Sequence, residues 1–168
     1  GILNERAGQL LTRINILDII NWLGTILSSR RSAEIALVEY GGPEWYDFAT
    51  AKQEFWTKNP QRAQSNNSLV FTYRPTEQEL INLLNMVSRT GGSEPGFINA
   101  QAAQKRAPWF SGVNPCAEIL LGNKCFCNLT EVDVAKFTNL GELEEAIRII
   151  SRANYRQTLV NLNDGILQ

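Results

Sequence analysis

Apolar positions in the first third of the chain alternate between helical and extended spacing. Within residues 10–27, Leu and Ile recur at every third or fourth position, which predicts a helix. The polar run at 28–32 interrupts this pattern, and the apolar residues at 33–38 then predict a short strand. After the turn residues at 41–43, residues 46–56 are predicted to form a second helix.

The same alternation continues along the rest of the chain. Residues 61–68 form a polar run that predicts a loop, and the β-branched and aromatic residues at 69–73 predict a strand. Thr76 and Glu79 have the spacing of a capping box, so a helix is expected to begin between them. Alternating helices and strands indicate an α/β fold. Further elements are expected at 97–99 (a strand tip), 117–121 and 126–132 (short strands or an extended finger) and 140–162 (a long helix).

Composition narrows the chemistry that this sequence can perform. The 168 residues carry a formal net charge of −1, which argues against a nucleic-acid or membrane-surface binder, and no apolar run is long enough for a membrane span. We expect no signal peptide, and three cysteines do not make a disulfide framework, so a cytoplasmic location is expected. The absence of His excludes His-based nucleophile systems and His-ligated zinc, and we expect no metal site. Cysteines, carboxylates, amides, arginines or a bound cofactor must therefore carry any chemistry.

The most informative short motif is Asn114-Pro115-Cys116-Ala117-Glu118. If this segment is extended, Asn114, Cys116 and Glu118 point to the same side, about 6–7 Å apart, because strand side chains repeat every two residues. An amide, a thiol and a carboxylate on one side could hold a hydroxyl-bearing substrate and take a proton from it. The alternative is an inert buried Cys beside ordinary Asn-Pro turn chemistry.

This motif also has a family resemblance. Together, NPCAEI at 114–119 and CNLTEV at 127–132 resemble the catalytic finger of ribonucleotide reductase large subunits, and the short interval between Cys116 and Cys127 looks most like the adenosylcobalamin-dependent, class II branch. The resemblance implies that residues 1–168 are a fragment of a ten-stranded α/β barrel with a finger loop at about 111–128. Other blocks occur in the family's order: RRSAEI at 30–35, SNNS at 65–68, GSEPGF at 92–97 and the segment 155–168.

The resemblance assigns roles to the finger residues. It implies that Cys116 carries the thiyl radical, that Glu118 acts as a base on the ribose 3′-hydroxyl, and that Asn114 orients the ribose hydroxyls. Cys127 is then one half of a dithiol whose partner, in family members, lies upstream of the position that Gly1 occupies. Cys125 has no expected family counterpart, so we predict a small buried residue there, with a substitute redox partner as the alternative.

Two further groups of residues are candidate nucleotide contacts. Arg30 and Arg31 could contact phosphate, since guanidinium groups match phosphate oxygens, or could form structural salt bridges. A second group resembles the loop that links an effector site to the substrate base, with a simple solvated loop as the alternative. Its members are Arg62, Gln64, Ser65, Asn66, Asn67 and Ser68.

The resemblance finally implies an activity and its partners. We expect reduction of ribonucleoside di- or triphosphates to deoxyribonucleotides for DNA synthesis, with adenosylcobalamin as the radical source. Expected partners are a deoxynucleotide or ATP effector and a thioredoxin-type reductant, in a monomer or homodimer. Two alternatives remain: the core of an oxygen-dependent class I reductase with a separate metal-radical subunit, and a non-catalytic nucleotide-binding module.

Overall fold

The computed structural model describes residues 1–26, 34–125 and 127–159. They divide into two compact units, Gly1–Asn123 and Lys124–Gln168. The first unit contains a parallel sheet and the Cys116 motif, and the second contains Cys127 and one long helix.

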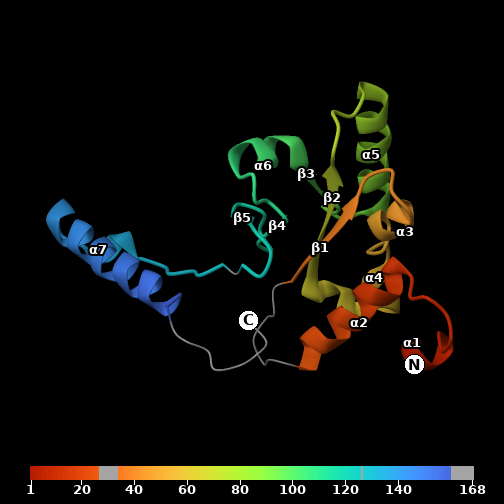
Figure 1. Ribbon diagram of the computed structural model, residues 1–168, viewed down its shortest axis with the longest axis horizontal. Helices are drawn as coiled ribbons and strands as arrows, with labels where there is room; N and C mark the ends of the chain where they lie inside the picture. Colours follow the sequence, from red (N-terminus) through yellow and green to blue (C-terminus); the bar gives the residue numbers. More distant parts are fainter. Residues whose placement is uncertain (27–33, 126, 160–168) are drawn as a thin grey trace. The chain divides into compact units, whose positions relative to one another are not determined.

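A three-stranded parallel sheet forms the centre of the first unit (Figure 1). Its strands are β1 (Glu34–Glu39), β2 (Ser65–Phe71) and β3 (Gly96–Asn99), in that spatial order. Parallel neighbours need a crossover between them, and helices supply it here. These are α3 (Trp45–Ala49), α4 (Phe55–Lys58) and the 3₁₀ turn η1 (Pro60–Gln64) between β1 and β2, and α5 (Glu77–Thr90) between β2 and β3. The expected α/β class is confirmed.

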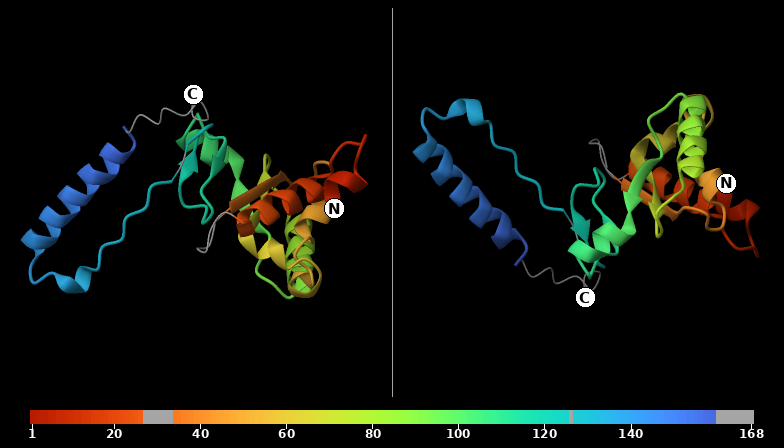
Figure 2. Two further views of the ribbon diagram at one scale, coloured as in Figure 1. Left: turned by 90° about the horizontal axis from the view of Figure 1, so that it is seen from below. Right: turned by 90° about the horizontal axis from the view of Figure 1, so that it is seen from above.

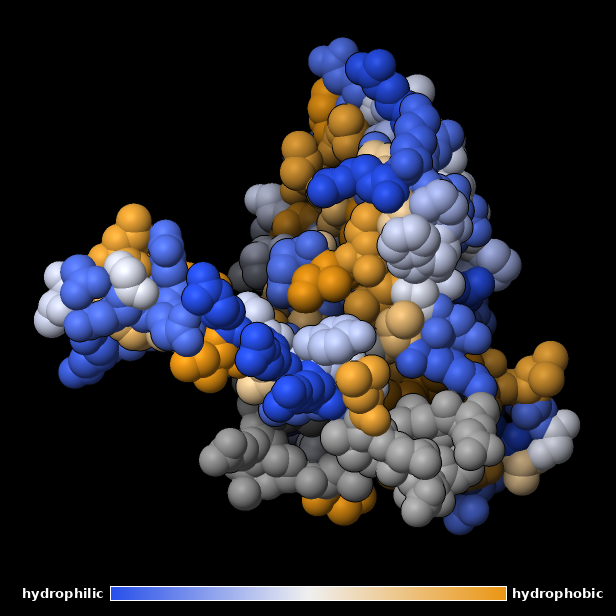
Figure 3. Space-filling model, turned by 60° about the vertical axis from the view of Figure 1, so that its left-hand side comes forward, coloured by the Kyte–Doolittle hydropathy of each residue, from blue (hydrophilic) through white to orange (hydrophobic). Residues whose placement is uncertain are grey.

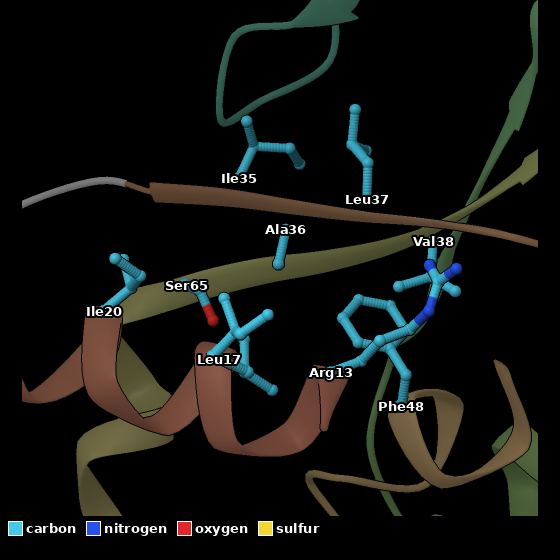
Figure 4. A pocket seen from close by; sticks show the side chains of 10 residues that line it. Arg13, Leu17, Ile20, Ile35, Ala36, Leu37, Val38, Phe48 and Ser65 are labelled. Carbon is cyan, nitrogen blue, oxygen red and sulfur yellow. The ribbon is translucent and has the colours of Figure 1, made fainter. Parts of the chain in front are cut away.

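One face of this sheet carries the hydrophobic core. Ala36 and Val38 point to one side of β1, while Ile35 and Leu37 point to the other (Figure 4), because successive strand side chains alternate. Val38 lies on the core side, where side chains from the helices close over the sheet. The buried core residues are Leu17, Val38, Phe48, Ala49, Ala51, Leu69, Phe71, Leu83 and Met86.

A short hairpin lies by the other face of the sheet. β4 (Gly112–Val113) and β5 (Leu120–Leu121) pair in antiparallel fashion. A Cβ added at Gly112 would lie 3.7 Å from a methyl carbon of Leu37, so the hairpin is in van der Waals reach of that face. It follows α6 (Ala100–Arg106), whose first turn is capped by the Asn99 side chain accepting from the Ala102 N–H at 3.0 Å.

The first predicted helix is confirmed as α2 (Arg13–Ile26), which follows the short α1 (Ile2–Glu5). Leu17 of α2 is buried in the core, and Asp18 and Asn21 are also buried. Large apolar side chains remain on the outside of the protein between hydrophilic ones (Figure 3). Those exposed on α2 are Ile16, Ile20, Trp22, Leu23 and Ile26.

The helix predicted at 46–56 is wrong as a single element. α3 ends at Ala49 and α4 begins at Phe55, with turns between them. Glu54, just before α4, has a φ of 52°, which a right-handed helix cannot contain. The break lets Phe48, Ala49 and Ala51 enter the core, while Trp56 stays exposed.

The loop predicted at 61–68 is also wrong. Residues Pro60–Gln64 form the 3₁₀ turn, and Ser65–Phe71 form the central strand β2. β2 is hydrogen-bonded to β1 from Ser65 onward and to β3 from Ser68 onward, so tertiary pairing overrides the low strand preference of Ser and Asn.

The second unit is built on α7 (Leu140–Gln157), preceded by the 3₁₀ turn η2 (Val134–Lys136). The Asn139 side chain caps α7 by accepting from the Glu142 N–H at 3.0 Å. The extended segment before η2 runs alongside α7 (Figure 2), where Asn128 and Thr130 both hydrogen-bond to Asn154.

Outcomes in this half of the chain differ by element. The long helix predicted at 140–162 is confirmed as far as Gln157, and its last predicted residues, 160–162, lie outside the described ones. Residues 127–132 form no strand, so the short strand predicted at 126–132 is wrong for the part that is described. Within the described ranges, no helix is both long and apolar enough to cross a membrane.

The capping box predicted at the start of α5 is confirmed and extends to a tyrosine. Thr76 and Glu79 exchange side-chain and backbone hydrogen bonds, and Tyr73 Oη donates to Glu79 Oε1 at 2.8 Å. The bonds from Thr76 and then from Tyr73 lower the pKa of Glu79. The Glu79 carboxylate in turn raises the pKa of Tyr73 to about 12, because it accepts a hydrogen bond that only the protonated phenol can donate.

Stability should therefore fall at alkaline pH through Tyr73. Its folded pKa of about 12 exceeds the ordinary value of 10.0, so its stabilising contribution is complete below pH 10 and is lost as the pH rises through 12. In Glu79→Gln, the pKa of Tyr73 should return towards 10.0, as measured by phenolate absorbance against Tyr73→Phe. Glu77→Gln, a neutralisation in the same helical turn, is the control. An unchanged titration in Glu79→Gln would refute this coupling.

Candidate active-site turn

Residues 114–118 form a tight turn between β4 and β5. The Ala117 N–H donates to the Asn114 carbonyl at 2.9 Å, and the Asn114 N–H donates to the Ile119 carbonyl at 3.3 Å. Ala117 has a φ of 66°, in the left-handed region. Of the two conformations considered for this motif, the extended one is therefore wrong and the turn at Asn114-Pro115 is confirmed. The strand predicted at 117–121 is also wrong except for Leu120–Leu121. The cause is the pairing of Val113 with Leu120, which requires the chain to reverse within the motif.

The turn nevertheless brings Asn114 and Glu118 together. Asn114 Nδ2 donates to Glu118 Oε1 at 2.6 Å, and Asn114 Oδ1 accepts from the Ile119 N–H at 3.0 Å. Asn114 is only 2% exposed, whereas Glu118 is exposed. A buried amide thus holds an exposed carboxylate in one orientation.

Cys116 lies within this turn and is exposed. An exposed thiol can meet a reactant from outside, so the alternative of an inert, buried Cys does not describe residue 116. The prediction that Cys125 is buried is wrong as well, because it is exposed immediately after the turn at 123–124. Cys116 belongs to the first unit and Cys127 to the second, so the joint action of these two thiols stays a prediction.

A hydrogen bond connects the turn to the sheet. Asn66 Nδ2, from β2, donates to the Pro115 carbonyl at 2.6 Å. The structure therefore places two of the predicted segments, 65–68 and 114–118, in direct contact.

The start of β2 is fixed by two charged side chains that the sequence did not single out. The Lys52 ammonium donates to the Ser65 carbonyl and pairs with Glu94 Oε2 at 2.7 Å. The same Glu94 oxygen accepts from the Asn67 N–H at 3.2 Å, at a level of β2 where β3 has not yet begun. Glu94 lies in the GSEPGF block, which offered a signal for it, while nothing local marks Lys52.

The remaining residues of the 65–68 segment are buried in the sheet. Ser65 Oγ donates to Asn67 Oδ1 at 2.8 Å, and within the described structure Asn67 Nδ2 is buried with no hydrogen-bond partner. Ser68 faces Gly96 on β3. A Cβ at residue 96 would come within 2.7 Å of Ser68 Oγ, so any larger residue there would require the Ser68 side chain to move.

Asn66 also lines a cavity of about 320 Å³ beside the start of β2. The Phe55 and Trp56 rings lie on its wall with centroids 4.2 Å apart, and the Lys52 ammonium is 5.7 Å from the Phe55 centroid. Aromatic rings beside ionic and amide groups can accept a planar polar molecule. A second cavity of about 320 Å³, between α2 and β1 (Figure 4), is mainly apolar and includes only Ser65 of the predicted site residues.

Arg62 does not reach this site. Its Nε and Nη2 donate to Asp18 Oδ1 and Oδ2, each at 2.6 Å, and its Nη1 donates to the Ala51 carbonyl. The Arg62 and Asp18 side chains are only 11% and 10% exposed. The guanidinium therefore joins η1 to α2 instead of facing a nucleotide.

The other predicted contacts are less defined. Gln64 is half-buried at the end of η1. Arg30 and Arg31 lie outside the described residues. Among the residues that the structure describes, no group of three or more Cys, Asp or Glu side chains could hold a metal ion.

Comparison with curated proteins adds a family to this geometry. The adenosylcobalamin-dependent ribonucleoside-triphosphate reductases of Lactobacillus gasseri and Lacticaseibacillus paracasei are each 33% identical to this chain, over 177 and 172 residues. The chain matches a segment of these reductases. Each match covers 94% of the chain and 22% of the relative, and the reductase of Lactobacillus leichmannii is 30% identical over the same shares.

The resemblance to adenosylcobalamin-dependent ribonucleotide reductases is thus confirmed over nearly the whole chain. The chain spans about a fifth of the length of these reductases, 22% in each case. No protein-family model matches the chain. No solved structure matches it either.

The buried Asp18–Arg62 pair predicts a large effect on folding. Asp18→Ala should lower the free energy of unfolding by about 3–5 kcal/mol, because it leaves the Arg62 guanidinium buried without its partner. Urea denaturation followed by circular dichroism measures this change. Lys58→Ala, which removes only the exposed Lys58–Glu54 pair, should leave the midpoint nearly unchanged. Equal small effects of both substitutions would show that the Asp18–Arg62 pair does not hold η1 to α2.

Proposed function

We propose that this chain is the catalytic segment of an adenosylcobalamin-dependent ribonucleotide reductase, with Cys116 as the residue that carries the thiyl radical. The observation that carries this proposal is the turn at 114–118. It exposes the Cys116 thiol two residues before Glu118, whose carboxylate is held in place by a buried amide, Asn114. The match of 94% of the chain to reductases of this name supports it.

Cys116 opens and closes the reaction in this proposal. A sulfur radical at Cys116 takes the hydrogen atom from C3′ of the ribose, which forms an S–H bond and leaves a carbon radical. After C2′ has been reduced, the same S–H bond returns its hydrogen atom to C3′ and the sulfur radical is restored. Cys116 is therefore unchanged over one cycle.

Glu118 and a pair of thiols perform the reduction at C2′. The Glu118 carboxylate accepts the proton of the 3′-hydroxyl, and the 2′-hydroxyl takes up a proton and leaves as water. Two thiols, of which Cys127 is one, supply two electrons and two protons and become a disulfide. The sum is a ribonucleotide and two thiols giving a deoxyribonucleotide, a disulfide and water.

Asn114 sets the geometry of this step. Its Nδ2 donates a hydrogen bond to Glu118 Oε1 at 2.6 Å, so the second carboxylate oxygen can accept from the 3′-hydroxyl. Its burial fixes both groups before substrate arrives, and such preorganisation is worth much in rate because a misplacement of about 1 Å can cost about 100-fold.

The exposure of the Cys116 thiol is compatible with an adenosylcobalamin cofactor. Adenosylcobalamin, when bound, supplies a carbon radical that takes the hydrogen atom from a thiol. Cys116 is exposed within its turn, so a cofactor docked against the turn can reach it, whereas a buried sulfur could not be reached. Cys116 is the residue of this chain that would face that group.

The rest of the proposal concerns the whole protein. The parallel strands β1–β3 would be part of a ten-stranded barrel, and the segment at about 111–128, which begins with the β4–β5 hairpin, would be its finger loop. The segment 64–68 reaches the site through Asn66. The substrate would be a ribonucleoside di- or triphosphate, the effector a deoxynucleotide or ATP, and the reductant of thioredoxin type in the cytoplasm.

Replacing the reactive sulfur tests the assignment of Cys116. In the full-length protein, Cys116→Ser should abolish deoxynucleotide formation, because an O–H bond is too strong to open and close in this cycle. Nucleotide binding at equilibrium should stay near normal, because Ser is almost the size of Cys. Product formation is measured by chromatography and binding by calorimetry. Sustained turnover by Cys116→Ser would remove the thiyl assignment.

Replacing the second thiol tests the assignment of Cys127. Cys127→Ser should allow at most one incomplete turnover with an external dithiol, because the electrons for C2′ cannot be supplied as a pair. Quantifying product per enzyme in a single-turnover experiment measures this. Cys125→Ser removes a neighbouring exposed thiol and should turn over many times. Repeated turnover by Cys127→Ser would show that Cys127 is outside the dithiol.

A further inference from the structure

The Asn66 side chain attaches the peptide bond before Cys116 to the sheet. The Pro115 carbonyl, which accepts from Asn66 Nδ2 at 2.6 Å, shares its peptide plane with the Cys116 nitrogen. Because the peptide unit is planar, fixing this oxygen also fixes the orientation of the backbone from which the Cys116 side chain projects. The bond is short for an N–H···O contact and joins segments 49 residues apart in sequence.

The residues before and after Asn66 on β2 are both fixed by hydrogen bonds to charged side chains. The residue before it, Ser65, has its carbonyl bound by the Lys52 ammonium. The residue after it, Asn67, has its N–H bound by Glu94, which also pairs with Lys52 at 2.7 Å. Asn66 itself is paired with Ile35 of β1. A donor on such a fixed strand loses little conformational entropy when it binds the turn.

The turn also has hydrogen bonds of its own on either side of Cys116. Ala117 N–H to the Asn114 carbonyl and Asn114 Oδ1 to the Ile119 N–H close it from within. The Ala117 bond restrains the peptide after Cys116, and the Asn66 bond restrains the peptide before it. Ala117 has a φ of 66°, an unfavourable conformation for a residue with a Cβ, so the turn benefits from an outside restraint.

We infer that Asn66 is a positioning residue for Cys116, and that its amide orients the reactive turn instead of reading a nucleotide base. This inference rests on the proposed function of Cys116. It also assigns the Lys52–Glu94 pair a purpose, which is to fix the strand segment that carries Asn66.

Kinetics of the full-length protein separate positioning from base recognition. Asn66→Ala should lower kcat about 10- to 100-fold while the nucleotide KM and equilibrium binding change by less than about twofold, because only the placement of the thiol is disturbed. Asn85→Ala removes an exposed amide from α5 and is the matched control, expected to behave as wild type. A raised KM or weakened binding with unchanged kcat would show that Asn66 contacts the nucleotide and would overturn the inference.

An isosteric variant adds a pH signature. Asn66→Asp keeps the shape of the side chain but, when ionised, cannot donate to the Pro115 carbonyl. Its kcat relative to wild type should therefore be as low as that of Asn66→Ala at pH 8 and should rise towards acidic pH, where the protonated carboxyl donates. A ratio that is independent of pH, or that falls towards acidic pH, would contradict a donor role for residue 66.

Amide hydrogen exchange tests the same link without turnover. In Asn66→Ala, exchange at the Ala117 and Ile119 amides should be about tenfold faster, because the turn loses the hydrogen bond that restrains it. Exchange in α5 and the melting temperature should match Asn85→Ala. Unchanged exchange at 117 and 119 would overturn the inference even if kcat falls. If Cys116→Ser were active, the proposed function would fail, while this exchange experiment would still decide whether Asn66 holds the turn.

Discussion

The Asn114 side chain is the element on which the geometry of the turn depends. Its oxygen accepts from the backbone of Ile119 and its nitrogen donates to the Glu118 carboxylate, so one buried amide both closes the chain reversal and aims an acidic group. A hydrogen bond of this kind contributes about 1 kcal/mol, and leaving its buried partner unsatisfied costs more. Structure and chemistry are therefore coupled at one residue, because any change that frees this amide also releases the carboxylate.

The parallel sheet gives this turn a stable reference. β2 is paired on both sides and carries Leu69 and Phe71 into the core, so its first residues are continuous with the best-packed part of the first unit. The partly buried ion pair of Lys52 and Glu94 fixes the residues of β2 that precede its pairing with β3. The apolar packing around Leu69 and Phe71 in this way also restrains the polar residues at the start of β2.

Much of the fold could be predicted because its signals are local. The spacing of Leu and Ile predicts α2, and the pair Thr76 and Glu79 predicts the start of α5. For residues 114–118 the sequence leaves two conformations open, because strand periodicity would place the three polar groups on one side, whereas Asn-Pro favours the turn that the structure shows. Both conformations predict proximity of Asn114 and Glu118, and only the structure distinguishes them.

Other features had no local signal at all. Arg62 stands in a polar run that is typical of a solvated loop, yet its partner Asp18 is 44 residues away and the two are buried together. Ser65 and Asn67 belong to a strand because of their pairing with β1, which short-range preference does not reveal. The role of Asn66 likewise depends on a contact with a residue far along the chain.

In the part of the chain that the structure describes, β1 and β3 each pair with a neighbour on one side only. Their outer backbone N–H and carbonyl groups form rows that another strand can complete, and β1 presents Ile35 and Leu37 beside its row. In a larger sheet, such edge strands pair with further strands. When the polypeptide is produced without such strands, the unpaired edges of β1 and β3 favour aggregation. The solubility of the polypeptide will therefore depend on what covers these edges.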